Sequence, residues 1–170
     1  MLSTISQPQY WNKIFEEKPV EELSWYEDDP ATSLGLIDEA QLGEHDLILL
    51  VGAGRTTLVQ TLLERGYKGL VATDISSVAL SKLRKDVDHP NKREIRTVQD
   101  DLTAPLVLVE LEPIRFWHDR ATFHFLTEES EQQTYFQLLD SLLQNGARGL
   151  IATFAPDGPD TCSGLPVARW

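Results

Sequence analysis

The chain has 170 residues, of which 41% are hydrophobic and 25% charged, so its composition excludes a disordered or fibrous protein. Its formal net charge of −12 repels phosphate backbones, and we expect no direct binding to nucleic acid. The lone cysteine, Cys162, excludes an internal disulfide, which favours a reducing compartment.

The N-terminal part, residues 1–45, is predicted to form a helical cap within a single domain that spans residues 1–170. Its first residues, Met1–Tyr10, are polar and contain no apolar signal core, so we expect a cytoplasmic protein. A first helix is indicated by apolar residues at helical spacing, namely Tyr10, Trp11, Ile14 and Phe15, before Pro19. A second helix is predicted from about Ala31 to Gly43.

The remainder, residues 46–170, alternates short apolar runs with helical patterns. This alternation predicts an α/β, Rossmann-like fold with a mostly parallel sheet and helices on both faces. The predicted strands are Leu47–Val51, Leu70–Thr73, Ile95–Val98, Ile114–His118 and Leu150–Phe154. None of these runs is long enough to cross a membrane. The predicted helix boundaries include Thr56, Gly66, Ser76, Thr127 as an N-cap, and Asn145–Gly146 as a C-terminal stop.

A glycine bend, formed by Val51, Gly52, Ala53 and Gly54, lies where the first strand turns into a helix. Glycines at such a turn let the backbone approach a ligand closely. The N–H groups at the start of the helix can bind a carboxylate or a phosphate. A G-x-G alone is also compatible with a purely structural turn.

Two acids follow at the ends of the next strands and strengthen the indication of a nucleoside site. Asp74 lies 22 residues beyond Gly52, where an acid binds ribose hydroxyls. Asp101 ends the third strand beside Asp100 and can accept a hydrogen bond from an adenine amino group. Ligands of open α/β sheets bind at the carboxyl ends of the strands, so we expect these residues to converge on one crevice.

Residues that the glycine bend lacks narrow the choice among nucleoside ligands. A dinucleotide fingerprint needs Gly or Ala three residues after the second glycine, and this chain has Thr57. No phosphate-cradling P-loop sequence occurs either. A looser bend followed by two acids suits S-adenosylmethionine (SAM), which has no pyrophosphate. An NAD-dependent oxidoreductase is kept as a rival hypothesis.

Several segments resemble a largely bacterial group of class I SAM-dependent methyltransferases. They are Tyr10–Phe15, Ser24–Tyr26, Val51–Gly54 with Leu58, Asp74–Ser76 with Ala79–Leu80, Trp117–Thr127, Thr153–Pro159 and Cys162–Val167. The likeness covers nearly the whole chain and implies methyl transfer from SAM to an acceptor, either a small molecule or a protein lysine. A broader likeness extends to protein-lysine methyltransferases with a similar Trp-rich opening.

The resemblance implies a role for each candidate residue. The cofactor-binding residues are predicted to be Val51, Gly52, Ala53, Gly54, Asp74, Ile75, Asp101, Leu102 and Asp119. Asp119 and His124 are the candidate catalytic residues facing the acceptor, although His124 is also compatible with a structural role. His118, Asp119 and His124 match no standard metal spacing, so we expect no metal site. Cys162 is expected to pack in a loop.

Two departures from the family pattern leave a second hypothesis open. The family usually has an acid two residues before the first glycine, where it helps to hold the SAM amino group, and this chain has Leu50. A C-terminal strand pair that completes the family's sheet is also missing from the sequence. The fifth strand would then be an exposed edge through which two copies could pair. A truncated or degenerate methyltransferase fold that acts as a non-catalytic binding module is the alternative.

Overall fold

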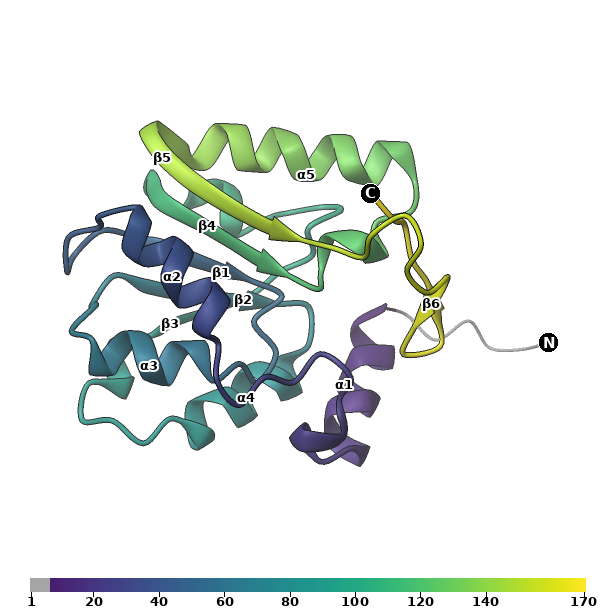
Figure 1. The fold of residues 1–170 in the computed structure, drawn as a ribbon, viewed down its shortest axis with the longest axis horizontal. Coiled ribbons are helices and arrows are strands. Elements are labelled where there is room, and N and C mark those ends of the chain that lie inside the picture. The colour runs from purple at the N-terminus through teal and green to yellow at the C-terminus, as the bar shows by residue number, and fades with distance from the viewer. Residues whose placement is uncertain (1–6) are drawn as a thin grey trace.

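The computed structural model of the protein describes residues 7–170 (Figure 1). Most of the opening segment considered above, residues 1–6, lies outside them. The α-helices are α1 (Gln7–Glu17), α2 (Ala31–Glu39), α3 (Leu58–Glu64), α4 (Ser77–Asp86) and α5 (Glu129–Leu142). The strands are β1 (Ile48–Val51), β2 (Leu70–Asp74), β3 (Arg96–Gln99), β4 (Ile114–Arg120), β5 (Leu143–Ala152), β6 (Thr161–Cys162) and β7 (Leu165–Pro166).

The main sheet has five strands in the order β3-β2-β1-β4-β5, and every neighbouring pair is parallel. Parallel neighbours require crossover connections, and helices supply most of them. The predicted α/β Rossmann-like fold is therefore confirmed. The strands β6 and β7 form a separate antiparallel pair, so β5 is an edge of the main sheet, as expected.

Helices cover both faces of the sheet and divide the core into two layers. The apolar side chains of α2, α3 and α4 pack on one face against alternate residues of β1, including Ile48 and Leu50. Those of α5 pack on the other face with Leu49 and Val51. Because both faces are covered, all four residues of β1 are buried, which explains its continuous apolar sequence.

Two helix boundaries were predicted correctly from local chemistry. The Ser76 hydroxyl caps α4 by accepting a hydrogen bond from the Ala79 N–H at 3.0 Å. Gly66 follows α3 with a φ of 88°, in the left-handed conformation that commonly ends a helix. These boundaries bring β2 back beside β1 and place Asp74 at its carboxyl end.

Three predicted helix boundaries were wrong, and the fifth strand, predicted over Leu150–Phe154, is β5 over Leu143–Ala152. Glu128, not Thr127, caps α5, in a capping box with Glu131, whose carboxylate accepts from the Glu128 N–H at 3.2 Å. The helix ends at Leu142 and β5 begins at once, so Asn145–Gly146 lies inside a strand. The helix α2 ends at Glu39, four residues before Gly43. Gln41, two residues after the helix, has a φ of 51°.

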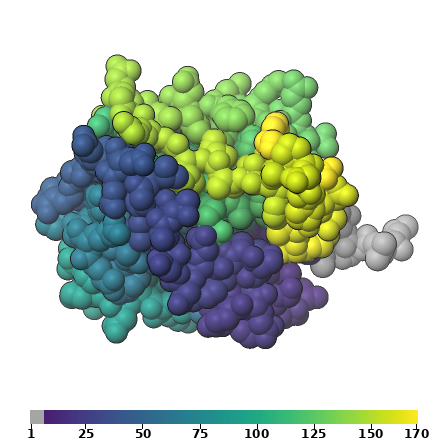
Figure 2. All heavy atoms as spheres, in the orientation of Figure 1, coloured from purple at the N-terminus to yellow at the C-terminus, as the bar shows by residue number. Residues whose placement is uncertain are grey.

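The N-terminal and C-terminal segments meet beside the carboxyl ends of the strands. In Figure 1, β4 and β5 point toward the yellow hairpin of β6 and β7, and α1 lies next to it. Figure 2 shows the purple and yellow segments in contact on this face. The Tyr10 hydroxyl donates a hydrogen bond to the Ser163 carbonyl, and this bond joins the two segments. No helix in the described part of the chain is long and apolar enough to cross a membrane.

Candidate functional site

Two adjoining clefts lie at the carboxyl edge of the sheet, where open α/β folds bind ligands. The larger encloses about 940 Å³, counting the solvent at its mouth, and the smaller about 510 Å³. Both are lined by Trp25, Gly52 and Arg120, so the clefts meet at the glycine bend.

The glycine bend has a backbone conformation that favours glycine. Gly52 and Gly54 have φ values of 55° and 54°, which side chains other than hydrogen rarely allow. A Cβ on Gly52 would lie 1.8 Å from the Thr122 Oγ1. Thr122 follows β4, so the bend and the β4 turn can only pack this closely because residue 52 is glycine.

Asp74 is held rigidly at the wall of the larger cleft. Its Oδ2 accepts from the Gly54 N–H and its Oδ1 from the Ser76 N–H, both at 2.8 Å. Burial raises the pKa of Asp74 to about 6, because the charged form loses hydration, although the two backbone N–H groups oppose the shift. The carboxylate thus ties the glycine bend to the start of α4 and still borders the cleft.

Asp100 and Asp101 both line the larger cleft, but their carboxylates accept hydrogen bonds from different groups. The Asp100 carboxylate accepts from the N–H groups of Leu106, Val107 and Leu108 and so anchors the following loop. Asp101 lines the same cleft as Asp74, with its Oδ1 held by the Thr103 N–H at 2.8 Å and hydroxyl at 2.7 Å. The predicted convergence of Gly52, Asp74 and Asp101 on one crevice is confirmed.

Most of the other residues that were predicted to bind the cofactor also border a cleft. Ile75 and Leu102 line the larger one, and Val51 and Ala53 line the smaller one. Gly54 lines neither cleft, and its contribution is the N–H that orients Asp74. A Cβ on Gly54 would lie 3.2 Å from the Phe15 ring, so this glycine also lets α1 approach the bend.

Aromatic side chains from three segments form one wall of the larger cleft. Trp11 of α1 makes edge contacts with Phe125, at a centroid distance of 4.9 Å, and with Trp25, at 5.8 Å. Phe15 lies 6.3 Å from both tryptophans. Glu131 of α5 adds a carboxylate to the same lining. The cleft therefore combines π faces with acids, a combination that suits a cationic or amine group.

The smaller cleft contains an ion pair that crosses its wall. The Arg120 Nε lies 3.0 Å from the Glu27 Oε2, and Arg120 also donates to the Trp25 carbonyl. Leu50, at the position where the resembling family has an acid, is 1% exposed and lines this cleft. Next to it on β4, His118 is hydrogen-bonded to the Ser33 hydroxyl at 2.9 Å, and burial lowers the pKa of His118 to about 4.

Asp119 does not lie in either cleft, which corrects its assignment to the cofactor and the acceptor. Its side chain is buried on the α5 face, where its Oδ1 accepts from the Thr122 and Phe123 N–H groups. Its Oδ2 accepts from the Tyr135 hydroxyl at 2.8 Å, and Trp117 Nε1 donates to that same hydroxyl. Burial raises the pKa of Asp119 to about 7. The carboxylate fixes the turn after β4.

His124 likewise lines neither cleft, so the structure does not support its role as a base. It is 1% exposed, and its ring is stacked on Phe154 at a centroid distance of 4.7 Å. Neither ring nitrogen has a hydrogen-bond partner among the described residues, and burial lowers the pKa of His124 to about 4. The neutral imidazole packs as an aromatic side chain.

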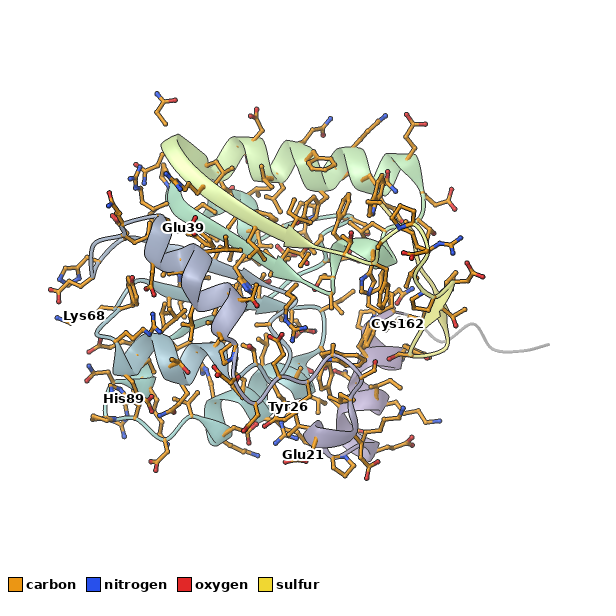
Figure 3. All side chains as sticks on the ribbon, in the orientation of Figure 1. Glu21, Tyr26, Glu39, Lys68, His89 and Cys162 are labelled. Atoms are coloured by element: carbon orange, nitrogen blue, oxygen red, sulfur yellow. The ribbon has the colours of Figure 1, made fainter. Side chains whose placement is uncertain are left out.

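Cys162 is buried in the C-terminal hairpin, with its Sγ 3.9 Å from the Ser24 Oγ. Figure 3 labels Cys162 on the side of the molecule opposite Lys68 and His89, with Tyr26 between them. Within residues 7–170, no group of three His, Cys, Asp or Glu side chains is placed to hold a metal ion.

Glu27, Arg120 and Thr122 were not singled out from the sequence. The signal that could have found Arg120 is the alternation of side chains along β4, which places Asp119 and Arg120 on opposite faces. Glu27 gave no such signal, because it lies in an irregular segment whose position over the bend depends on tertiary packing.

Comparison with known proteins agrees with this architecture. No family model matches the chain. It is 25% identical over 151 residues to the "eEF1A lysine and N-terminal methyltransferase homolog" of Drosophila melanogaster, a match that covers 84% of this chain. The chain spans only 21% of the length of that curated relative.

Solved structures show the same fold at lower identity. The CcbJ methyltransferase from Streptomyces caelestis aligns with a TM-score of 0.66 and 18% identity, over 86% of this chain and 58% of that one. The glycopeptide N-methyltransferase MtfA in complex with SAM aligns with a TM-score of 0.59 and 17% identity, over 78% and 58%. The chain therefore has the fold of SAM-dependent methyltransferases, for which SAM is the expected cofactor.

Proposed function

We propose that this chain is the SAM-binding part of a methyltransferase that transfers the methyl group to an amine nitrogen. The observation that carries the proposal is the convergence of Gly52, Asp74 and Asp101 on one cleft at the carboxyl edge of a parallel sheet. These residues fit an adenosyl group, because a carboxylate that is held by two N–H groups can still accept hydrogen bonds from ribose hydroxyls. In this proposal Asp101 and Leu102, which line the same cleft, would bind the adenine.

In this proposal the protein binds and orients the reactants. When bound, SAM would supply a methyl group on its positively charged sulfonium sulfur, which would keep the bonding electron pair when the acceptor nitrogen takes the methyl and gives up a proton to solvent. The aromatic wall around Trp11 and Phe125 would exclude water and align the acceptor, and such alignment supplies much of the rate enhancement in bimolecular reactions.

An amine acceptor is supported by the chemistry of the larger cleft. Aromatic faces attract cations, and the wall of Trp11, Trp25 and Phe125 lines the same cleft as the carboxylate of Glu131. The net charge of −12 also attracts cationic partners. The Drosophila relative is named for lysine and N-terminal methylation and MtfA for N-methylation. These likenesses agree with a nitrogen acceptor, and a protein lysine is the acceptor we propose.

Binding of S-adenosylhomocysteine, the demethylated product, tests the cofactor assignment by isothermal titration calorimetry. We expect Asp74→Ala to lose measurable binding, because its carboxylate both accepts from the ribose and fixes the bend. Asp140→Ala, an exposed acid on α5, is the matched control and should bind as the wild type does. Equal affinity in all three proteins would contradict the assignment.

The acceptor is tested by mass spectrometry of a lysine-containing peptide incubated with SAM and the protein. The same peptide with an acetylated lysine and a blocked N-terminus has no free amine and is the control. We expect a mass increase of one methyl group only on the free amine. Methylation of both peptides, or of neither while SAM still binds, would contradict the amine proposal.

A further inference from the structure

The ion pair between Glu27 and Arg120 has no role in the mechanism described so far. The side chains are 36% and 28% exposed, and an ion pair of that exposure contributes little to stability. Both line the smaller cleft, and Arg120 also lines the larger one. The pair therefore lies on the path that leads from the adenosyl region across the glycine bend.

The smaller cleft also lacks an acid on the sheet. Leu50 is apolar, and its neighbour His118 has a pKa lowered to about 4, so neither offers a negative charge. Of the described residues that line this cleft, Glu27 is the one carboxylate. Its backbone is fixed because the Thr57 hydroxyl donates to the Glu27 carbonyl at 2.9 Å, and Thr57 precedes α3 directly after the bend.

We propose that Glu27 and Arg120 bind the zwitterionic amino-acid end of the cofactor, with the ammonium on Glu27 and the carboxylate on Arg120. This inference rests on the proposed function. A ligand that bears one positive and one negative group can replace each partner of the ion pair, so both protein charges stay compensated. The pair is open to ligand because both side chains border the cleft.

In this assignment Glu27 replaces the acid that the resembling family has at the position of Leu50. The carboxylate comes from the segment between α1 and α2 instead of from β1. Binding of the amino-acid end would therefore hold this segment, which also carries Trp25 and Tyr26, against the bend. The cap over the clefts and the cofactor would then stabilise one another.

Three adenosyl compounds separate the two charges in calorimetric titrations of the full chain. S-adenosylhomocysteine has both the ammonium and the carboxylate, decarboxylated SAM has the ammonium alone, and 5′-methylthioadenosine has neither. The variants are Glu27→Gln and Arg120→Gln. Glu112→Gln removes a charge from an exposed ion pair remote from the clefts, whose Arg96 Nη2 lies 2.7 Å from Glu112 Oε2, and is the matched control.

We expect Glu27→Gln to weaken S-adenosylhomocysteine and decarboxylated SAM by about tenfold or more, because each loses a charge-assisted hydrogen bond. Arg120→Gln should weaken S-adenosylhomocysteine by a similar factor and leave decarboxylated SAM unchanged or tighter. The affinity for 5′-methylthioadenosine should change by less than about twofold in both variants. Glu112→Gln should match the wild type throughout.

Unchanged affinity of both variants for S-adenosylhomocysteine would overturn the inference while the proposed function stands. Equal weakening of all three compounds would also overturn it, because the pair would then act on the shape of the cleft. A wild-type protein that binds none of the three would instead contradict the proposed function itself. Thermal unfolding of each variant shows whether it still folds. If Arg120→Gln does not fold, Arg120→Lys replaces it in the titrations, and because it keeps the charge it should retain most of the affinity for S-adenosylhomocysteine.

Discussion

At the scale of single residues, Asp74 and Asp119 show how surroundings assign different work to the same side chain. Both are buried and both have a raised pKa, to about 6 and about 7. Asp74 keeps contact with a cleft, whereas Asp119 faces Tyr135 and the backbone of the β4 turn. A raised pKa therefore marks burial in both cases, and the side chain borders a cleft only in the first.

The pKa of Asp74 predicts a pH dependence of cofactor binding. Below about pH 6 the carboxyl group gains a proton and accepts hydrogen bonds less strongly, so the affinity for S-adenosylhomocysteine should fall as the pH is lowered from 7 to 5. Asp74→Asn should bind about 10- to 100-fold more weakly at pH 7, with little further change on acidification. Calorimetry across this pH range measures both effects, and an unaltered pH profile in the variant would contradict them.

Tyr135 tests the structural role of Asp119. Tyr135→Phe removes the hydroxyl that donates to Asp119 and accepts from Trp117, and leaves two buried polar groups unpaired. We expect a loss of about 1–3 kcal/mol in the free energy of unfolding, measured by urea titration. The affinity for S-adenosylhomocysteine should be retained, because Tyr135 lines neither cleft. Loss of binding with unchanged stability would assign Tyr135 to the site instead.

At the scale of elements, the glycine bend and the turn after β4 form one packed unit. Gly52→Ala places a Cβ against Thr122 and forces a side chain into a left-handed backbone conformation. We expect a destabilisation of about 1–3 kcal/mol by urea titration. Adding Thr122→Gly should recover the steric part and leave the conformational part, which a double-mutant cycle separates. Strict additivity of the two substitutions would contradict the contact.

The start of α5 offers a second test at this scale. Glu128→Ala should reduce the free energy of unfolding by about 1 kcal/mol, because the capping box with Glu131 is lost. Thr127→Ala, one residue earlier, should change it by less than about 0.5 kcal/mol. The reverse order of effects would restore Thr127 as the cap.

The elements that the sequence predicted well are those whose signals are local. The buried run of β1, the Ser76 cap and the left-handed Gly66 each follow from a few neighbouring residues. The edge strand β5 was placed too late, because exposed positions at an edge give it little apolar pattern. The convergence of Asp74 and Asp101 followed from the topology of the sheet. The side-chain direction of Asp119 instead depended on which face of β4 packs against α5.

At the scale of the whole molecule, four buried titratable groups oppose one another in pairs. Asp74 and Asp119 have raised pKa values, so the folded state binds more protons than the unfolded state between about pH 4 and their folded values. His118 and His124 have pKa values lowered to about 4, so the unfolded state binds more protons between about pH 4 and 6.5. The first pair makes stability fall as the pH rises, and the second makes it rise.

The contributions of these four groups should nearly cancel, so they leave the stability almost flat between about pH 4.5 and 6. Asp119→Asn removes one of the two falling contributions. Relative to the wild type, this variant should gain stability as the pH rises through the same window, as measured by urea unfolding at several pH values. Parallel pH profiles for the two proteins would contradict the assigned shift of Asp119.

The alternation along β4 has a further consequence for mutation. Consecutive residues His118, Asp119 and Arg120 enter opposite layers, toward α2, toward Tyr135 and toward Glu27. A deletion or insertion of one residue in this strand would exchange those destinations, driving the guanidinium into an apolar layer and the carboxylate to the ligand side. Neither layer can accommodate a strand that is paired one residue out of register, so β4 should tolerate substitutions far better than changes in its length.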